Sequence, residues 1–177
     1  MATYFSIENR AGVGFNSTGI ADVSSTQGPY TLGTIVRAKD SATTALGVGE
    51  FVYLLYTTAT VEGSVVTFNQ ATGSAAPVAT TTERSGAPVA IAMAAAAAGQ
   101  YGWAQIGGVA KVAKGVVDFP TASPIFRSGV TAGYVTVTAA SGNQILGAMT
   151  ANSASVASTT STILVQINRP HLQGQIT

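Results

Sequence analysis

The side chains that most often carry out catalysis are few in this sequence and lie far apart along it. His171 is the only histidine, and cysteine is absent, which excludes thiolate nucleophiles and disulfides. A Ser–His–acid triad would have to use His171, but no Gly-x-Ser-x-Gly motif supplies its serine. The acidic residues include no close pair for general acid–base work. We therefore expect a protein that is not an enzyme, with His171 exposed or in an interface. An esterase or lyase that depends on His171 is the remaining catalytic alternative.

Ligands for metals and cofactors are equally sparse. A single histidine cannot form a cluster of imidazole ligands, and no run of alternating Asp and Asn residues indicates a calcium loop. The segment from Gly12 to Ser17 has part of the glycine spacing of a dinucleotide-binding loop. It lacks the context of that loop, since no buried strand precedes it and no helix follows it. We expect neither a metal ion nor a cofactor.

Charge and hydropathy argue against nucleic acid and membrane as direct partners. The formal net charge is +1, and Lys111 and Lys114 are the only lysines close together, whereas a phosphate-binding face needs clustered bases. The longest apolar run, Pro88 to Ala98, is shorter than the roughly 20 residues of a membrane-spanning helix. Met1 to Ser17 also lacks the pattern of a signal peptide. These features predict a soluble protein that is not exported.

The elements that must position any functional residue are predicted to be β-strands. The first thirty residues show no sustained periodicity and are expected to form an extended N-terminal arm, and residues 31–177 to form one β-rich domain. In that domain, short runs rich in β-branched and aromatic residues alternate with Gly, Pro, Asn and Ser clusters, a pattern typical of a single β-barrel or β-sandwich. The predicted strands are Thr31–Ala38, Glu50–Tyr56, Ser64–Phe68, Val89–Met93, Tyr101–Ile106, Val109–Lys114, Tyr134–Thr138, Ile145–Met149 and Thr162–Asn168.

Two short segments give more local predictions. Gly107-Gly108 stands between two strand-like runs, and both central residues of a type I′ turn need positive φ, so the pair predicts a tight hairpin. The five alanines Ala94 to Ala98 favour a helix by propensity but are too few for a stable one. A single helical turn and a buried extended segment remain open for them.

The aromatic residues allow two interpretations. They are Tyr53, Tyr56, Tyr101, Trp103 and Tyr134. Exposed on one surface, they would form a platform on which a sugar stacks, whereas in a β domain such residues more often belong to the core or an interface. We favour the structural role.

Charged residues make up only 8% of the chain, against about 25% in a typical soluble domain. A free monomer usually stays soluble through surface charge. The composition therefore favours a component of an assembly.

Three segments, in their order along the chain, resemble the capsid decoration (head cement) proteins of tailed bacteriophages. They are Gly33–Asp40 followed by Gly49–Leu54, Pro88–Met93 leading into Gln100–Gly108, and Val165–Pro170 with Gln173-Gly174. The resemblance extends from about Gly33 to Gly174. It implies a β-rich fold without catalytic residues that assembles as a homotrimer or homodimer on the outer surface of the capsid, after synthesis in the bacterial cytoplasm.

We therefore expect a protein that binds the major capsid protein and itself and stabilises the phage head. The alternative is a receptor- or glycan-binding module of a tail fibre or baseplate. The candidate interface residues are Tyr4, Arg10, Arg37 and Arg169, because Arg and Tyr commonly anchor interfaces and the first two lie in the expected arm.

Overall fold

The protein is an all-β domain in which no helix occurs among the described residues. The computed structural model describes residues 4–6, 20–40, 46–81, 85–115 and 118–174. The strands are β1 (Tyr4–Ser6), β2 (Val23–Ser24), β3 (Ile35–Asp40), β4 (Val48–Tyr56), β5 (Val65–Phe68), β6 (Ser74–Pro77), β7 (Val89–Ala92), β8 (Gln100–Ala113), β9 (Pro124–Arg127), β10 (Val135–Thr136), β11 (Gln144–Thr150) and β12 (Thr162–Leu172).

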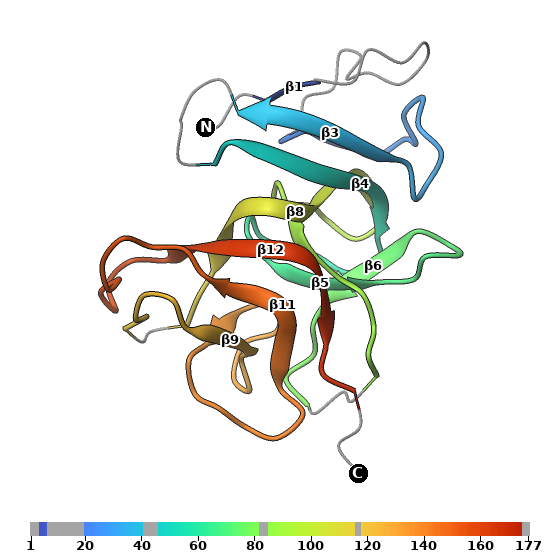
Figure 1. The fold of residues 1–177 in the computed structure, drawn as a ribbon. Coiled ribbons are helices and arrows are strands. Elements are labelled where there is room, and N and C mark those ends of the chain that lie inside the picture. The colour runs from blue at the N-terminus through green and yellow to red at the C-terminus, as the bar shows by residue number, and fades with distance from the viewer. Residues whose placement is uncertain (1–3, 7–19, 41–45, 82–84, 116–117, 175–177) are drawn as a thin grey trace.

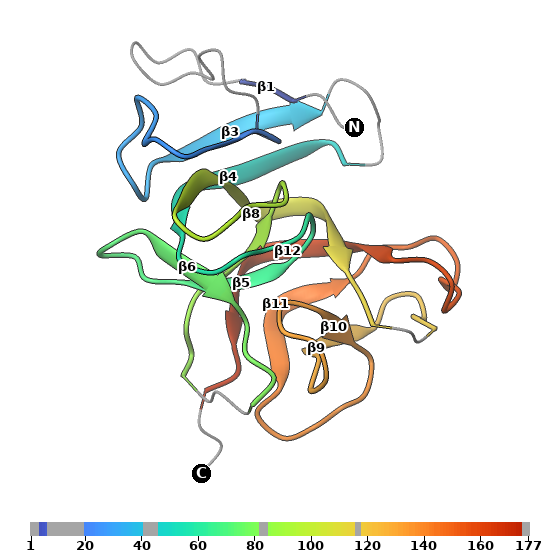
Figure 2. The same ribbon diagram turned by 180° about the vertical axis from the view of Figure 1, so that it is seen from behind.

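All the strands belong to one mixed sheet that curves around its own core (Figure 1). Its order is β1-β3-β4-β6-β5-β7-β8-β12-β11-β9-β10, with β2 paired to β8 and an additional pairing between β4 and β8. Figure 2 shows β9 and β10 beside β11 from behind. The all-β prediction is confirmed, and the curved sheet is consistent with a barrel-like or sandwich-like domain.

The predicted strands that carry long apolar or alternating runs are present. β4, β5, β7, β11 and β12 each overlap a predicted segment within a few residues. β6 and β9 were not predicted, because Ser-Ala-Ala-Pro and Pro-Ile-Phe-Arg are too short to show a period and both contain proline. β6 pairs with the preceding strand β5 and with the end of β4, and β9 pairs with the two strands that follow it, β10 and β11.

The hairpin predicted at Gly107-Gly108 is wrong. Both glycines lie inside β8, a single strand of 14 residues that pairs with β4 in its first half and with β12 in its second. Glu50 pairs with Gly107 and Phe51 with Gln105, so one extra residue makes a bulge at this crossing. Gly108 has a φ of +95°, and the glycines therefore serve a bulge and a bend within one strand.

The buried Gln105 side chain holds the bulge in place. Its Nε2 donates hydrogen bonds to the Gly107 oxygen at 2.9 Å and to the Val109 oxygen at 3.1 Å. A Cβ atom on Gly49 would lie 2.8 Å from that Nε2 atom, so the amide fits only because glycine stands opposite it. The bend of β8 is thus built from one amide and the small residues around it.

Trp103 is the centre of the aromatic part of the core. It is 1% exposed, and its ring lies 5.0 Å from that of Tyr30 and 5.1 Å from that of Tyr53, measured between centroids. Because side chains alternate along β8, Ala104 points to the other side and packs with Leu54 and Tyr56. A third and larger cluster, with Ile125, Val165 and Ile167 among its members, fills the part of the sheet formed by β8, β9, β11 and β12.

The end of the expected N-terminal arm is packed on the domain. Ile20 and Tyr30 are buried beside Trp103, and Val23–Ser24 pairs with β8. A segment expected to stay extended and unpacked therefore contributes to the core over residues 20–30. Residues 7–19 lie outside the described part of the chain.

The alanine run forms neither a helix nor a fully buried strand. Ala96 is buried and forms an isolated bridge with Thr60, while Ala97 and Ala98 are exposed in the turn that precedes β8. Gly99 follows with a φ of +83°. The helical alternative is excluded. The segment is an irregular connection that is fixed to the sheet by the backbone bridge of Ala96 to Thr60.

Alkaline pH is expected to destabilise the protein through Tyr56. This side chain is fully buried and donates a hydrogen bond to the Trp103 oxygen at 3.0 Å, and burial raises its pKa above the ordinary value of 10.0. The folded protein keeps this proton where the unfolded chain loses it, so the stabilisation is complete below about pH 10 and declines above it. The free energy of unfolding then falls by up to about 1.4 kcal/mol per pH unit. Urea unfolding between about pH 8 and about pH 11.5 measures it.

The variant Tyr56→Phe keeps the buried ring and should flatten that slope. Lys114 acts in the opposite direction. Burial lowers the pKa of Lys114 below 10.5, and the negative charge of Asp118 partly offsets this effect. The contribution of Lys114 to the free energy of unfolding therefore rises with pH up to about pH 10.5. Both proteins contain Lys114, and their difference isolates Tyr56. Equal slopes in the two proteins would contradict the prediction.

Candidate interface on the outer face of the sheet

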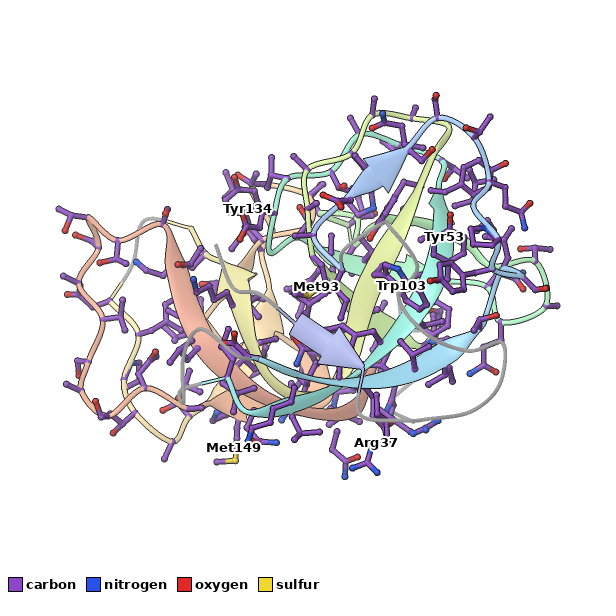
Figure 3. All side chains as sticks on the ribbon, turned by 90° about the horizontal axis from the view of Figure 1, so that it is seen from above. Arg37, Tyr53, Met93, Trp103, Tyr134 and Met149 are labelled. Atoms are coloured by element: carbon purple, nitrogen blue, oxygen red, sulfur yellow. The ribbon has the colours of Figure 1, made fainter. Side chains whose placement is uncertain are left out.

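The register of β3, β4, β8, β12 and β11 places one set of side chains on the side of the sheet that faces away from Trp103. In Figure 3, Arg37 and Met149 point to this side, and Trp103 and Met93 lie on the opposite side. We call this side the outer face. It comprises Ile35, Arg37, Lys39, Val48, Glu50, Lys111, Met149, Leu164, Gln166 and Arg169.

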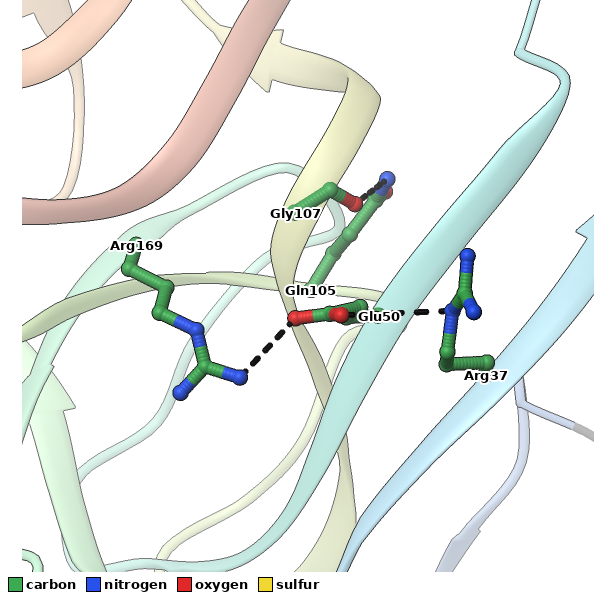
Figure 4. A network of polar contacts seen from close by, with 5 residues as sticks. All are labelled: Arg37, Glu50, Gln105, Gly107 and Arg169. Atoms are coloured by element: carbon green, nitrogen blue, oxygen red, sulfur yellow. Dashed lines mark hydrogen bonds and ion pairs between the residues drawn. The ribbon is translucent and has the colours of Figure 1, made fainter.

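Glu50 connects two arginines in the middle of the outer face (Figure 4). Arg37 lies opposite Glu50 in the β3–β4 ladder, with 3.9 Å between Nε and Oε1. Arg169 Nη2 donates a hydrogen bond to Glu50 Oε2 at 3.1 Å. The arginine side chains are 51% and 63% exposed, so each pair adds only about 0–1 kcal/mol to stability. The network orients the guanidinium groups more than it holds the fold.

Arg169 reaches Glu50 because β12 is irregular at this point. Leu146 pairs with His171, but Ala148 pairs with Ile167, so extra residues of β12 loop out between these pairs. Arg169 has a φ of +44°, a conformation that costs a residue other than glycine about 1–3 kcal/mol. Gly147 opposite it also has a positive φ, and a Cβ there would lie 2.8 Å from the Asn168 oxygen. Strain of this kind is typical of functional positions.

Exposed bases are concentrated on the outer face. Among the described residues, the exposed lysines and arginines are Arg37, Lys39, Lys111 and Arg169, and all four lie there. The remaining described bases, Lys114 and Arg127, are buried. Glu50 is the one acid of this face in the described part of the chain; Asp22, Glu62 and Asp118 are exposed elsewhere and Asp40 is buried. In the sequence the bases and acids are scattered along the chain, which gives no sign of this separation.

Apolar side chains are exposed between these charges. Ile35 is 43% exposed, Val48 is 38% exposed and Met149 is 45% exposed. Isolated exposed apolar residues are normal, but a group of them interspersed with arginine has the composition of an interface.

A half-open hollow of about 510 Å³ borders the outer face. Ile35, Arg169 and His171 stand among its lining residues, together with the apolar side chains of Val52, Phe68 and Ile106. The hollow is large enough to receive side chains of a partner that rests on the face.

Two of the four predicted interface residues, Arg37 and Arg169, are brought together by the fold. Tyr4 begins β1 at the sheet edge, where it pairs with Asp40, and Arg10 lies outside the described residues. The prediction missed Glu50, Lys39 and Lys111. The alternation of apolar and charged residues from Val36 to Lys39 was the available sequence signal for Lys39, whereas the others depend on strand order.

The structure does not expose the aromatic residues that a sugar platform would need. Trp103, Tyr53 and Tyr56 are buried, and Tyr101 and Tyr134 are only partly accessible. His171 is exposed beside Pro88, and no hydrogen bond or ion pair joins it to an acidic side chain in the described part of the chain. Within the same residues there is no group of three His, Asp or Glu side chains that could hold a metal ion. None of the described segments is a helix long and apolar enough to cross a membrane.

Comparison of the chain with protein-family models, with curated proteins and with solved structures gave no match.

Proposed function

We propose that the protein is a decoration protein of a bacteriophage head, which binds the major capsid protein on the outer surface of the capsid and stabilises the shell. The observation that carries the proposal is the outer face. On a chain with only 8% charged residues, the exposed bases among the described residues and several of the exposed apolar side chains lie on one side of one sheet. A one-sided docking surface suits a subunit that lies on a lattice.

Self-association into a homotrimer or homodimer is part of the proposal. A stable contact normally buries more than about 1,000 Å² in total. Repetition over a lattice adds avidity that a single contact lacks. The protein would be made in the bacterial cytoplasm and would act on the virion, without a cofactor and without direct contact with nucleic acid or membrane.

Co-sedimentation with undecorated, expanded phage heads tests the proposal. We expect saturable binding, with added density at symmetry-related positions when the pellets are imaged. Heads saturated with unlabelled protein, which should take up no labelled protein, are the control. No binding by folded protein to intact heads would contradict the proposal and favour a receptor- or glycan-binding module of the tail.

A further inference from the structure

We propose that the outer face docks on an acidic and partly apolar surface of a partner protein, and that neither a second copy of this chain nor a nucleic acid occupies it. The inference deepens the proposed function and rests on it, because it identifies the partner surface as that of the capsid lattice.

The charges of the face define the chemistry of its partner. Arg37, Lys39, Lys111 and Arg169 are exposed on it, and Glu50 is the single acid on it among the described residues. Both arginines already form ion pairs with Glu50. A surface that complements this pattern carries carboxylates opposite Lys39 and Lys111, for which no hydrogen bond or ion pair is found within the described part of the chain.

The same charges argue against a second copy as the occupant. In a two-fold symmetric contact the same patch occurs on both subunits, so bases would face bases across the contact. Like charges opposed across an interface are strongly unfavourable. A head-to-tail contact, as in a trimer, would need an acidic patch elsewhere on the chain, and the described residues contain no close group of three His, Asp or Glu side chains. We therefore assign self-association to another surface and the outer face to a different protein.

A nucleic acid fits the face less well than a protein does. Ile35, Val48 and Met149 stand exposed between the bases, and phosphates gain nothing from such side chains. An apolar protein surface with acidic groups satisfies both kinds of side chain.

Glu50 acts as a positioning residue in this scheme. Arg37 and Arg169 lie on opposite sides of Glu50, and each forms an ion pair with one of its two carboxylate oxygens (Figure 4). Arg169 lies in the irregular part of β12 with its backbone at positive φ. The two guanidinium groups are thus set in place before the partner arrives, which lowers the entropy lost on binding.

The test compares two variants with the same net charge. Lys39→Gln/Lys111→Gln removes two bases from the outer face, and Ser25→Glu/Thr131→Glu adds two acids at exposed positions away from it. Both change the formal net charge from +1 to −1. Thermal unfolding should show that both variants fold.

Binding of full-length protein to undecorated expanded heads is then measured from about 50 mM to about 500 mM NaCl. We expect binding of the wild type to weaken as salt rises. The lysine variant should bind roughly tenfold more weakly than the wild type at low salt, and the control variant about as well as the wild type.

The outcomes separate the two proposals. Wild-type binding that is insensitive to salt and equal in both variants overturns the acidic partner and leaves the decoration function standing. Absence of wild-type binding overturns both. Loss of self-association in the lysine variant, seen by sedimentation velocity, makes a second copy the occupant and overturns the inference. Lysine-dependent binding to duplex DNA without binding to heads makes a nucleic acid the occupant and also overturns the inference.

Discussion

Replacing Trp103 with alanine is expected to lower the free energy of unfolding by about 3–5 kcal/mol. The indole is 1% exposed and packs against Tyr30 and Tyr53, so its removal leaves a cavity in the most aromatic part of the core. Since domains are usually stable by about 5–15 kcal/mol, such a loss unfolds a large fraction of a marginal protein. Urea unfolding followed by circular dichroism measures the change without depending on the removed fluorophore.

The matched substitution is Trp103→Phe, which keeps an aromatic ring at this position and should cost clearly less than alanine. A protein that stays fully stable as Trp103→Ala but loses binding to a sugar would contradict the buried role and support the glycan-binding alternative.

Replacing Gly108 with alanine is expected to cost about 3 kcal/mol or more. Gly108 has a φ of +95°, and a Cβ atom there would clash with the Val48 backbone oxygen, which no side-chain rotation relieves. The chain would have to move where β8 passes from β4 to β12, and the Gln105 amide lies in the same place. Thermal and urea unfolding report the loss.

Gly86→Ala is the control for this prediction. Gly86 also has a positive φ, +63°, but a Cβ there meets no atom within 4 Å. It should cost only about 1 kcal/mol, the conformational penalty alone. Equal losses at the two positions would show that the close approach at Gly108 does not matter.

The sequence allowed the fold class and most strands to be predicted, but not the way they connect. Alternation marked β12, and β-branched or aromatic runs marked β4 and β7, because these signals are local. Gly107-Gly108 misled because the dipeptide that suits a tight turn also suits a bulge, and only strand pairing distinguishes the two.

The candidate interface was predicted in part. Arg37 and Arg169 were selected by residue type, but their common partner Glu50 is 119 residues from Arg169 in the sequence. No local pattern links residues so far apart. The concentration of bases on one face has the same origin, since Lys111 reaches it only through the order β4-β8-β12.

The place of β12 in the middle of the sheet also governs how the chain can fold. β12 lies between β8 and β11, so the second half of β8 has no neighbour on that edge until residues 162–172 have left the ribosome. Earlier strands expose unpaired edges during that interval, and the contacts that close them span long stretches of sequence. We expect slow folding and a nascent chain that depends on chaperones, so that low temperature during expression should raise the yield of soluble protein.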